Sequence, residues 1–213
     1  MDIRKEKFIK SLFDFLTVSG SLMVLNFLWI LCSLPIITIG PATCALYKVC
    51  LKLTEDKTYT VLKCFFEAFK ENFKQSLLVG AFSLFAIVLL YADFNYILQV
   101  QGFQQKLFIV VAFVTLAVLL IVITYLNGLI VSFNNTLKGH IINSFKLAFV
   151  NPLQTILMWL IILFPFIVYF FISPYIIVSV GWMLLLFGVS LPVYLCSLVL
   201  IRIFKRFTPQ DRR

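Results

Sequence analysis

Length, composition and charge place this chain in a lipid environment. It has 213 residues, of which 62% are hydrophobic and 13% are charged, and its mean hydropathy is +1.05. A soluble domain carries about 25% charged residues, so this composition excludes an ordinary soluble fold. The formal net charge is +9, but the basic residues flank apolar runs and therefore indicate membrane topology rather than nucleic-acid binding. The sequence predicts one all-α domain, a polytopic transmembrane helical bundle whose main partner is the lipid bilayer.

Four charge-free runs organise the chain and supply its membrane-spanning segments. A span needs about 20 residues to cross a hydrocarbon core of about 30 Å. We expect six membrane elements, the second of them short, together with two amphipathic helices at the membrane interface. The expected interfacial helices are 3–14 and 60–74, and the expected membrane elements are 15–34, 36–53, 75–92, 107–131, 148–172 and 176–201.

The first apolar run decides the topology. It is interrupted by Pro35 and by Gly40-Pro41, and proline disfavours helix in the residue before it but suits the first turn of a new helix. If the second element does not cross, the 18 basic residues divide 5 to 13 between the two sides. If it crosses, they divide 17 to 1, with only Lys106 outside. The positive-inside rule favours six crossings, which puts both termini in the cytoplasm.

Two stretches that each precede an outward-going span echo one another. The matches are short and the residue alphabet is biased, so an internal repeat and chance both remain open. The first stretch contributes Phe65, Ala68, Phe69, Asn72, Gln75 and Ser76, and the second contributes Phe145, Ala148, Phe149, Asn151, Gln154 and Thr155.

Few polar residues lie inside the expected spans. Asn26, Lys48 and Asn127 are the candidate intramembrane polar contacts. An amide in lipid usually bonds a neighbouring helix, so helix–helix contact is favoured over a substrate site. Lys48 lies close to the inner end of its element, where its amine can reach the interface.

Residues able to support catalysis are sparse. His140 is the only histidine, and we expect it to be solvated in an inner loop. The five cysteines match neither a disulfide framework nor a zinc spacing. The sequence has no nucleotide-binding, serine-hydrolase or zinc-protease motif. We therefore expect no enzymatic activity, no metal and no cofactor.

The segment around the first break resembles a known family. Residues 26–52 read NFLWILCSLPIITIGPATCALYKVCLK, and residues 65–78 read FFEAFKENFKQSLL. Both are similar to the YesL family of small bacterial membrane proteins, and the resemblance covers nearly the whole chain, 1–213, as a single domain. The family-motif turn comprises Pro35, Thr38, Gly40, Pro41 and Thr43, and two later stretches add a cytoplasmic motif of Asn134, Asn135 and Asn151.

The resemblance implies a multi-pass protein of the bacterial cell membrane associated with carbohydrate uptake, with sugar-importer membrane subunits as partners. A permease of such an importer would carry a cytoplasmic Glu-Ala-Ala loop followed by glycine. Here Glu67-Ala68 is followed by Phe69, and no glycine comes before Gly80. A non-enzymatic accessory or assembly component is therefore favoured, and a small stand-alone transporter of a sugar or another small solute is the alternative. The sequence leaves the oligomeric state open.

The six-crossing topology predicts that the two ends of the second element face opposite sides of the membrane. Single cysteines introduced at positions 37–39 should react with an impermeant thiol reagent from outside the cell. Cysteines introduced at 55–58 should react only after the membrane is made permeable. Labelling of both sets from the cytoplasmic side alone would rule out the second crossing.

Overall fold

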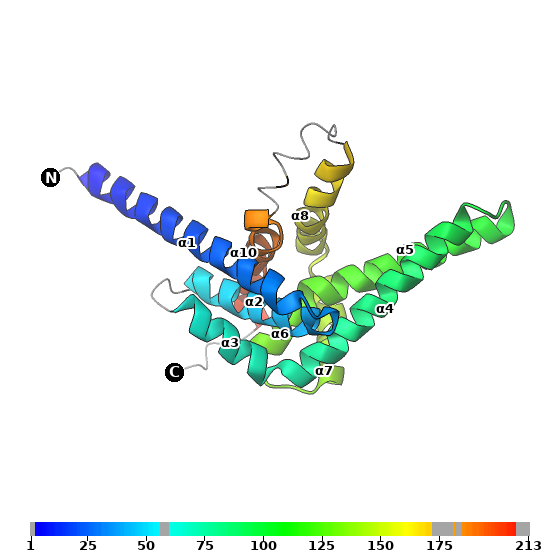
Figure 1. Ribbon diagram of the computed structural model, residues 1–213, viewed down its shortest axis with the longest axis horizontal. Helices are drawn as coiled ribbons and strands as arrows, with labels where there is room; N and C mark the ends of the chain where they lie inside the picture. The colour runs from blue at the N-terminus through cyan, green and yellow to red at the C-terminus, as the bar shows by residue number, and fades with distance from the viewer. Residues whose placement is uncertain (1–2, 56–59, 172–180, 182–184, 208–213) are drawn as a thin grey trace.

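Figure 1 shows the computed structural model, which describes residues 3–55, 60–171, 181 and 185–207. Within these ranges every regular element is helical, which confirms the all-α class. The elements are α1 Ile3–Ser33, the short 3-10 helix η1 Ile36–Thr38, α2 Ile39–Glu55, α3 Val61–Glu71, α4 Phe73–Ile97, α5 Phe103–Ile121, the π-helical turn η2 Val122–Leu126, α6 Asn127–Ser132, α7 Leu137–Val150, α8 Pro152–Phe171 and α10 Ser190–Phe207.

Several described helices are long and apolar enough to cross a membrane. Four stretches meet this condition: Leu12–Ser33, Ile36–Glu55, Phe73–Ile97 and Phe103–Ser132. Leu137–Val150 and Pro152–Pro165 meet it only as a pair, bent by 104°. The chain therefore has four or five candidate spans in its described part. The expected element 176–201 falls partly on residues outside the described ranges.

The first helix differs from expectation because it has no boundary near residue 15. Separate elements were predicted at 3–14 and 15–34, but α1 runs without interruption from Ile3 to Ser33. A change from amphipathic to apolar sequence alters the surroundings of a helix without removing any of its backbone hydrogen bonds. No proline falls inside α1, so nothing in the backbone ends the helix early.

Three later boundaries also differ. The predicted helix 60–74 ends at Glu71, and α4 begins at Phe73 after a break at Asn72, whose φ and ψ are −100° and 8°. The predicted span 107–131 is divided by the π-helical turn η2. The predicted start at 148 is wrong because residues 137–150 form α7, and α8 starts only at Pro152. Proline fixes its own φ and lacks an N–H, so it suits this first position.

Asn72 separates α3 from α4, and Asn151 separates α7 from α8, with similar hydrogen bonds. Each side-chain amide donates to the carbonyl oxygen four residues earlier, at 3.1 Å in both cases. Four residues later, the Ser76 hydroxyl donates to the Asn72 carbonyl at 2.6 Å, and the Thr155 hydroxyl donates to the Asn151 carbonyl at 2.9 Å. These residues are matched pairs in the sequence echo. The same two kinds of bond also occur at Asn95 and Ser83 within α4, so the shared geometry does not decide between an internal repeat and chance.

Helix α2 is the centre of the bundle. It contacts α1, α3, α4, α6 and α10, and 11 of its 17 residues are buried. Small residues such as Gly40, Ala42 and Ala45 occupy much of its first half. Small side chains let helices approach closely in membranes, where packing rather than hydrophobic burial drives association.

The start of α2 approaches α4 closely. A Cβ added to Gly40 would lie 2.1 Å from the Ser76 carbonyl oxygen, and a Cβ added to Gly80 would lie 2.8 Å from the Gly40 Cα. These are backbone atoms, so a side chain could not relieve the overlap by changing rotamer. Glycine at both positions is therefore required for this crossing.

Three parts of the chain leave this centre in different directions (Figure 1). The first half of α1 extends to one side, the α4–α5 hairpin extends to the other, and α8 projects separately. In the outer part of the hairpin the two helices pack on each other, and the centroids of the Tyr96 and Phe108 rings are 4.4 Å apart. Most of the hairpin's apolar surface is left exposed.

The glycine contact predicts that Gly40→Ala destabilises the protein. The added methyl group forces α2 away from α4, and overpacking of this kind costs about 1–3 kcal/mol. The measurement is thermal unfolding in mild detergent, where the variant should melt below the parent protein. Gly20→Ala is the matched control, because a Cβ there meets nothing within 4 Å. Equal melting temperatures for both variants would contradict the contact.

Candidate functional site

The family-motif turn joins the end of α1 to the start of α2. Pro35 is extended, with φ −75° and ψ 109°, and precedes η1. The Thr38 hydroxyl lies 2.6 Å from both the Cys32 and the Pro35 carbonyl oxygens and can donate to either. Cys32 is in the last turn of α1, where carbonyl groups have no partner within the helix. Thr38 thus satisfies the end of α1 while it shapes the turn.

The rest of the motif secures the first turns of α2. Pro41 is buried there, where its missing N–H costs nothing. The Thr43 hydroxyl donates to the Ile39 carbonyl at 2.7 Å and accepts from the Trp29 indole N–H at 3.0 Å. All five motif residues are therefore accounted for by the α1–α2 corner and its packing on α4.

Lys48 lies on α2 and reaches a different helix. Its Nζ donates to the Val131 carbonyl oxygen, one residue before the end of α6. A cation at a helix C-terminus interacts favourably with the helix dipole and satisfies an unpaired carbonyl. Lys48 thus ties α2 to α6.

Asn26 connects α1 to the segment that leads into α10. Its Nδ2 donates to the Leu185 carbonyl at 2.7 Å, and its Oδ1 accepts from the Val189 and Ser190 backbone N–H groups at 3.0 and 3.1 Å. The side chain is buried, with 1% of its residue surface exposed. It therefore bonds the first N–H groups of α10 in the way that an N-cap residue would.

The π-helical turn places a second group of polar side chains inside the bundle. The Tyr125 hydroxyl lies 2.8 Å from the Thr155 hydroxyl of α8. Asn127 Nδ2 donates to the Ile123 carbonyl at 3.4 Å, but its buried Oδ1 has no hydrogen-bond partner. The buried Tyr47 hydroxyl on α2 also has none. Short π-helical segments often mark functional positions, and buried polar groups are normally paired.

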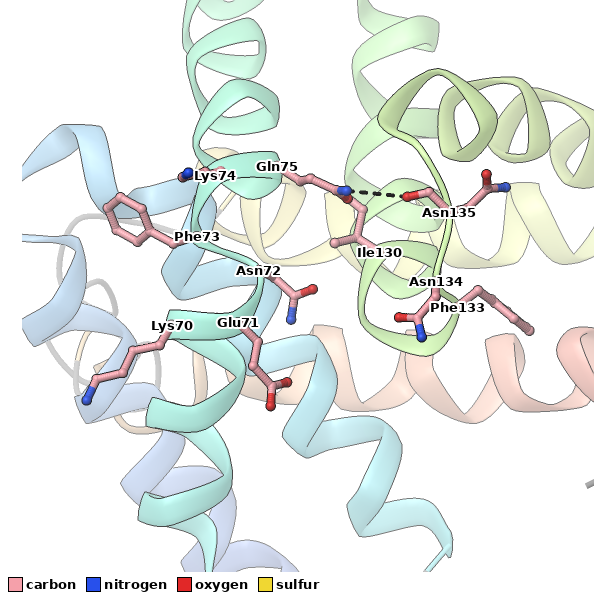
Figure 2. Close-up of a pocket in the computed structure, with 10 residues that line it drawn as sticks. All are labelled: Lys70, Glu71, Asn72, Phe73, Lys74, Gln75, Ile130, Phe133, Asn134 and Asn135. Atoms are coloured by element: carbon pink, nitrogen blue, oxygen red, sulfur yellow. Dashed lines mark hydrogen bonds between the residues drawn. The ribbon is translucent and has the colours of Figure 1, made fainter.

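An open polar hollow of about 580 Å³ lies between the α3–α4 junction and the loop after α6 (Figure 2). The side chains of Asn72 and Asn134 extend toward each other across it, whereas those of Lys70 and Lys74 extend to the other side of the α3–α4 junction. Gln75 Nε2 donates across the hollow to the Asn135 carbonyl at 3.3 Å. Its lining consists of Lys70, Glu71, Asn72, Phe73, Lys74, Gln75, Ile130, Phe133, Asn134 and Asn135.

The three residues of the expected cytoplasmic motif separate into two places. Asn134 and Asn135 line the hollow, whereas Asn151 lies at the α7–α8 break and donates to the Leu147 carbonyl of α7. Asn135 also accepts from the Thr136 backbone N–H, and Thr136 caps α7 by accepting from the Gly139 N–H. The loop is thus held by its own side chains before α7 begins.

The expectation of a solvated His140 is wrong. His140 is part of α7 and only 1% exposed, and its Nδ1 has no hydrogen-bond partner. The helix forms because Thr136 caps it, and the turn of α7 then directs the imidazole toward the core. Within the described residues, no group of three His, Cys, Asp or Glu side chains could hold a metal ion.

The sequence did not identify Tyr47 and Tyr125 as polar groups buried inside the bundle. It also did not identify Gln75 as part of the polar hollow. Tyr47 and Tyr125 are aromatic residues in aromatic-rich apolar runs, so composition did not distinguish them. Gln75 was noted only as part of the echo. A polar residue beside the charged end of a span was the one signal that could have pointed to it.

Residues 22–94 match the family described as a protein of unknown function, DUF624. The match begins in α1, includes the motif turn, α2 and α3, and ends near the end of α4. Neither the curated proteins nor the solved structures provide a match. The matched region therefore contains both the Gly40–Gly80 crossing and one side of the polar hollow.

The Asn26 contacts predict that Asn26→Ala loosens α10. The change leaves buried N–H groups at Val189 and Ser190 without an acceptor, at a cost of about 1–3 kcal/mol. The variant should melt at a lower temperature in detergent and become more sensitive to protease in its C-terminal part. Asn95→Ala is the matched control, because Asn95 bonds only to Tyr91 of its own helix. A loss of stability no greater than that of the control would contradict this assignment.

Proposed function

We propose that this multi-pass membrane protein is a non-enzymatic accessory or assembly component for carbohydrate uptake in the bacterial cell membrane, with both termini in the cytoplasm. The YesL resemblance supports the association with sugar import, and the 17 to 1 division of basic residues supports the orientation. Such a protein would act through contacts with importer membrane subunits rather than through chemistry of its own.

The observation that carries the proposal is the projecting α4–α5 hairpin. Its two helices pack on each other and extend away from the centre of the bundle (Figure 1). Large side chains on both helices are exposed, among them Phe85 at 61% and Phe113 at 71%. Exposed aromatic residues are frequent anchors at protein interfaces, and a span with so little internal packing leaves room for another helix.

The central helices support the same role. Thr38, Thr43 and Lys48 each bind another part of this chain, so these polar groups of the family-motif turn and of α2 fix the bundle itself. A rigid centre with projecting helices suits a protein that positions or stabilises a partner.

The test is co-purification from the native host in mild detergent. The tagged protein should recover importer membrane subunits, and the double variant Phe85→Ala with Phe113→Ala should recover several-fold less, since loss of an aromatic anchor costs at least about 1 kcal/mol. Phe15→Ala with Phe27→Ala is the control, because it removes two exposed rings from α1. Normal sugar uptake and normal permease levels in a deletion strain would refute the proposal.

A small stand-alone transporter is the second candidate, and the unpaired groups inside the bundle favour it. The Tyr47 hydroxyl and the Asn127 Oδ1 are both buried without partners, and Asn127 follows the π-helical turn directly. Such groups could bind a hydroxyl-rich solute. Proteoliposomes containing only this protein distinguish the candidates: sugar flux that Asn127→Leu abolishes supports transport, and no flux across a panel of sugars excludes a sugar transporter.

A further inference from the structure

A second concavity lies beside the polar hollow. It has a volume of about 380 Å³ and is mainly apolar. Phe133 lines both the hollow and this apolar groove, and its ring packs edge-on against Phe204 of α10 with the centroids 5.3 Å apart. The groove is lined by Leu129, Phe133, Asn143, Lys146, Leu147, Val150 and Phe204.

The hollow and the groove lie where the chain enters and leaves the membrane. The hollow includes Phe73 and Lys74, at the first residues of the candidate span Phe73–Ile97. It also includes Phe133 and Asn134, just beyond the end of the candidate span Phe103–Ser132. Both spans therefore have the hollow at the same end, which places it at the boundary between headgroups and hydrocarbon.

The charges of the two linings favour an anion. Lys70 and Lys74 line the hollow and Lys146 lines the groove, against the single carboxylate of Glu71. Among the described residues, the ion pair that forms on this part of the chain is Lys63–Glu67, outside both linings. All three lysines are exposed, so a ligand at the membrane surface can reach them.

We propose that the hollow and the groove together bind one anionic phospholipid of the bilayer. Its phosphate lies in the hollow beside the amides of Asn72 and Asn134. The long, exposed side chains of Lys70 and Lys74, which extend from the other side of the α3–α4 junction (Figure 2), turn toward it on binding. One acyl chain passes Phe133 into the groove. A soluble anion would use the hollow but leave the groove empty, whereas a lipid fills both. Lipid is also the solvent of the neighbouring spans, so its local concentration is high. This site does not depend on a role in sugar uptake.

The headgroup is tested by native mass spectrometry of the detergent-purified protein. Phosphatidylglycerol should bind more tightly than phosphatidylcholine with the same acyl chains. Lys70→Gln with Lys74→Gln should weaken phosphatidylglycerol binding roughly ten- to thirty-fold, because each lysine near a charged headgroup contributes about 1 kcal/mol. Lys63→Gln with Lys106→Gln is the control, since it removes two exposed lysines outside the hollow. Equal binding of the two lipids, or an equal loss in the control, would overturn the proposal.

The acyl chain is tested by closing the groove. Val150→Trp should fill part of it and weaken phosphatidylglycerol binding several-fold, whereas Val114→Trp, at an exposed position on α5, should leave binding unchanged. Glycerol 3-phosphate and inorganic phosphate, which have no tail, should displace the lipid only at far higher concentration. Displacement at concentrations similar to that of the lipid, or no effect of Val150→Trp, would show that the hollow binds a free anion and would overturn the two-part site.

Discussion

The backbone contact between Gly40 and Gly80 is the constraint on which the rest of the bundle depends. It brings the start of α2 against α4 with no side chain between them, and α2 in turn contacts α1, α3, α6 and α10. Helix α2 is packed against five neighbouring helices. A change in the tilt of its first turn would therefore displace every contact further along the helix. The position of α2 thus sets the positions of the helices that surround it.

Polar side chains stabilise the bundle further by bonding backbone groups at the ends of helices. In a bilayer no water is present to satisfy an unpaired backbone group, so helix ends and irregular turns need partners from the protein. Thr38 supplies one for the end of α1, Lys48 for the end of α6, and Asn26 for the start of α10. Each of these residues joins two elements, which explains why polar residues persist in a chain that is otherwise so apolar.

The sequence predicted the membrane class and the break between the first two helices, because composition and proline act locally. It did not predict that α1 continues through residue 15, since a change in polarity does not end a helix. It placed the break between α3 and α4 after residue 74 rather than at Asn72, and it began a span at 148, where α7 continues to Val150. Asparagine is tolerated inside helices, as Asn95 of α4 shows, so its presence alone does not mark a helix end. The polar hollow depends on Gln75 and Asn135, which are far apart in sequence, and no local pattern reports such a pairing.

The two echoing halves differ at a position that matters for helix packing. Counting from the paired asparagines, Gly80 in the first half corresponds to Trp159 in the second. Glycine allows α2 to meet α4 backbone to backbone, and a tryptophan at the equivalent position of α8 is too large for a contact of that kind. Helix α8 contacts η2 through side chains, with the Tyr125 hydroxyl 2.8 Å from the Thr155 hydroxyl. The first half is therefore closed by packing, and the second is held together by side chains, with the π-helical turn and the unpaired Asn127 oxygen beside them. The polar hollow lies where the two halves meet, because six of its lining residues, 70–75, come from the first half and the other four come from the loop after α6 and from α6 itself.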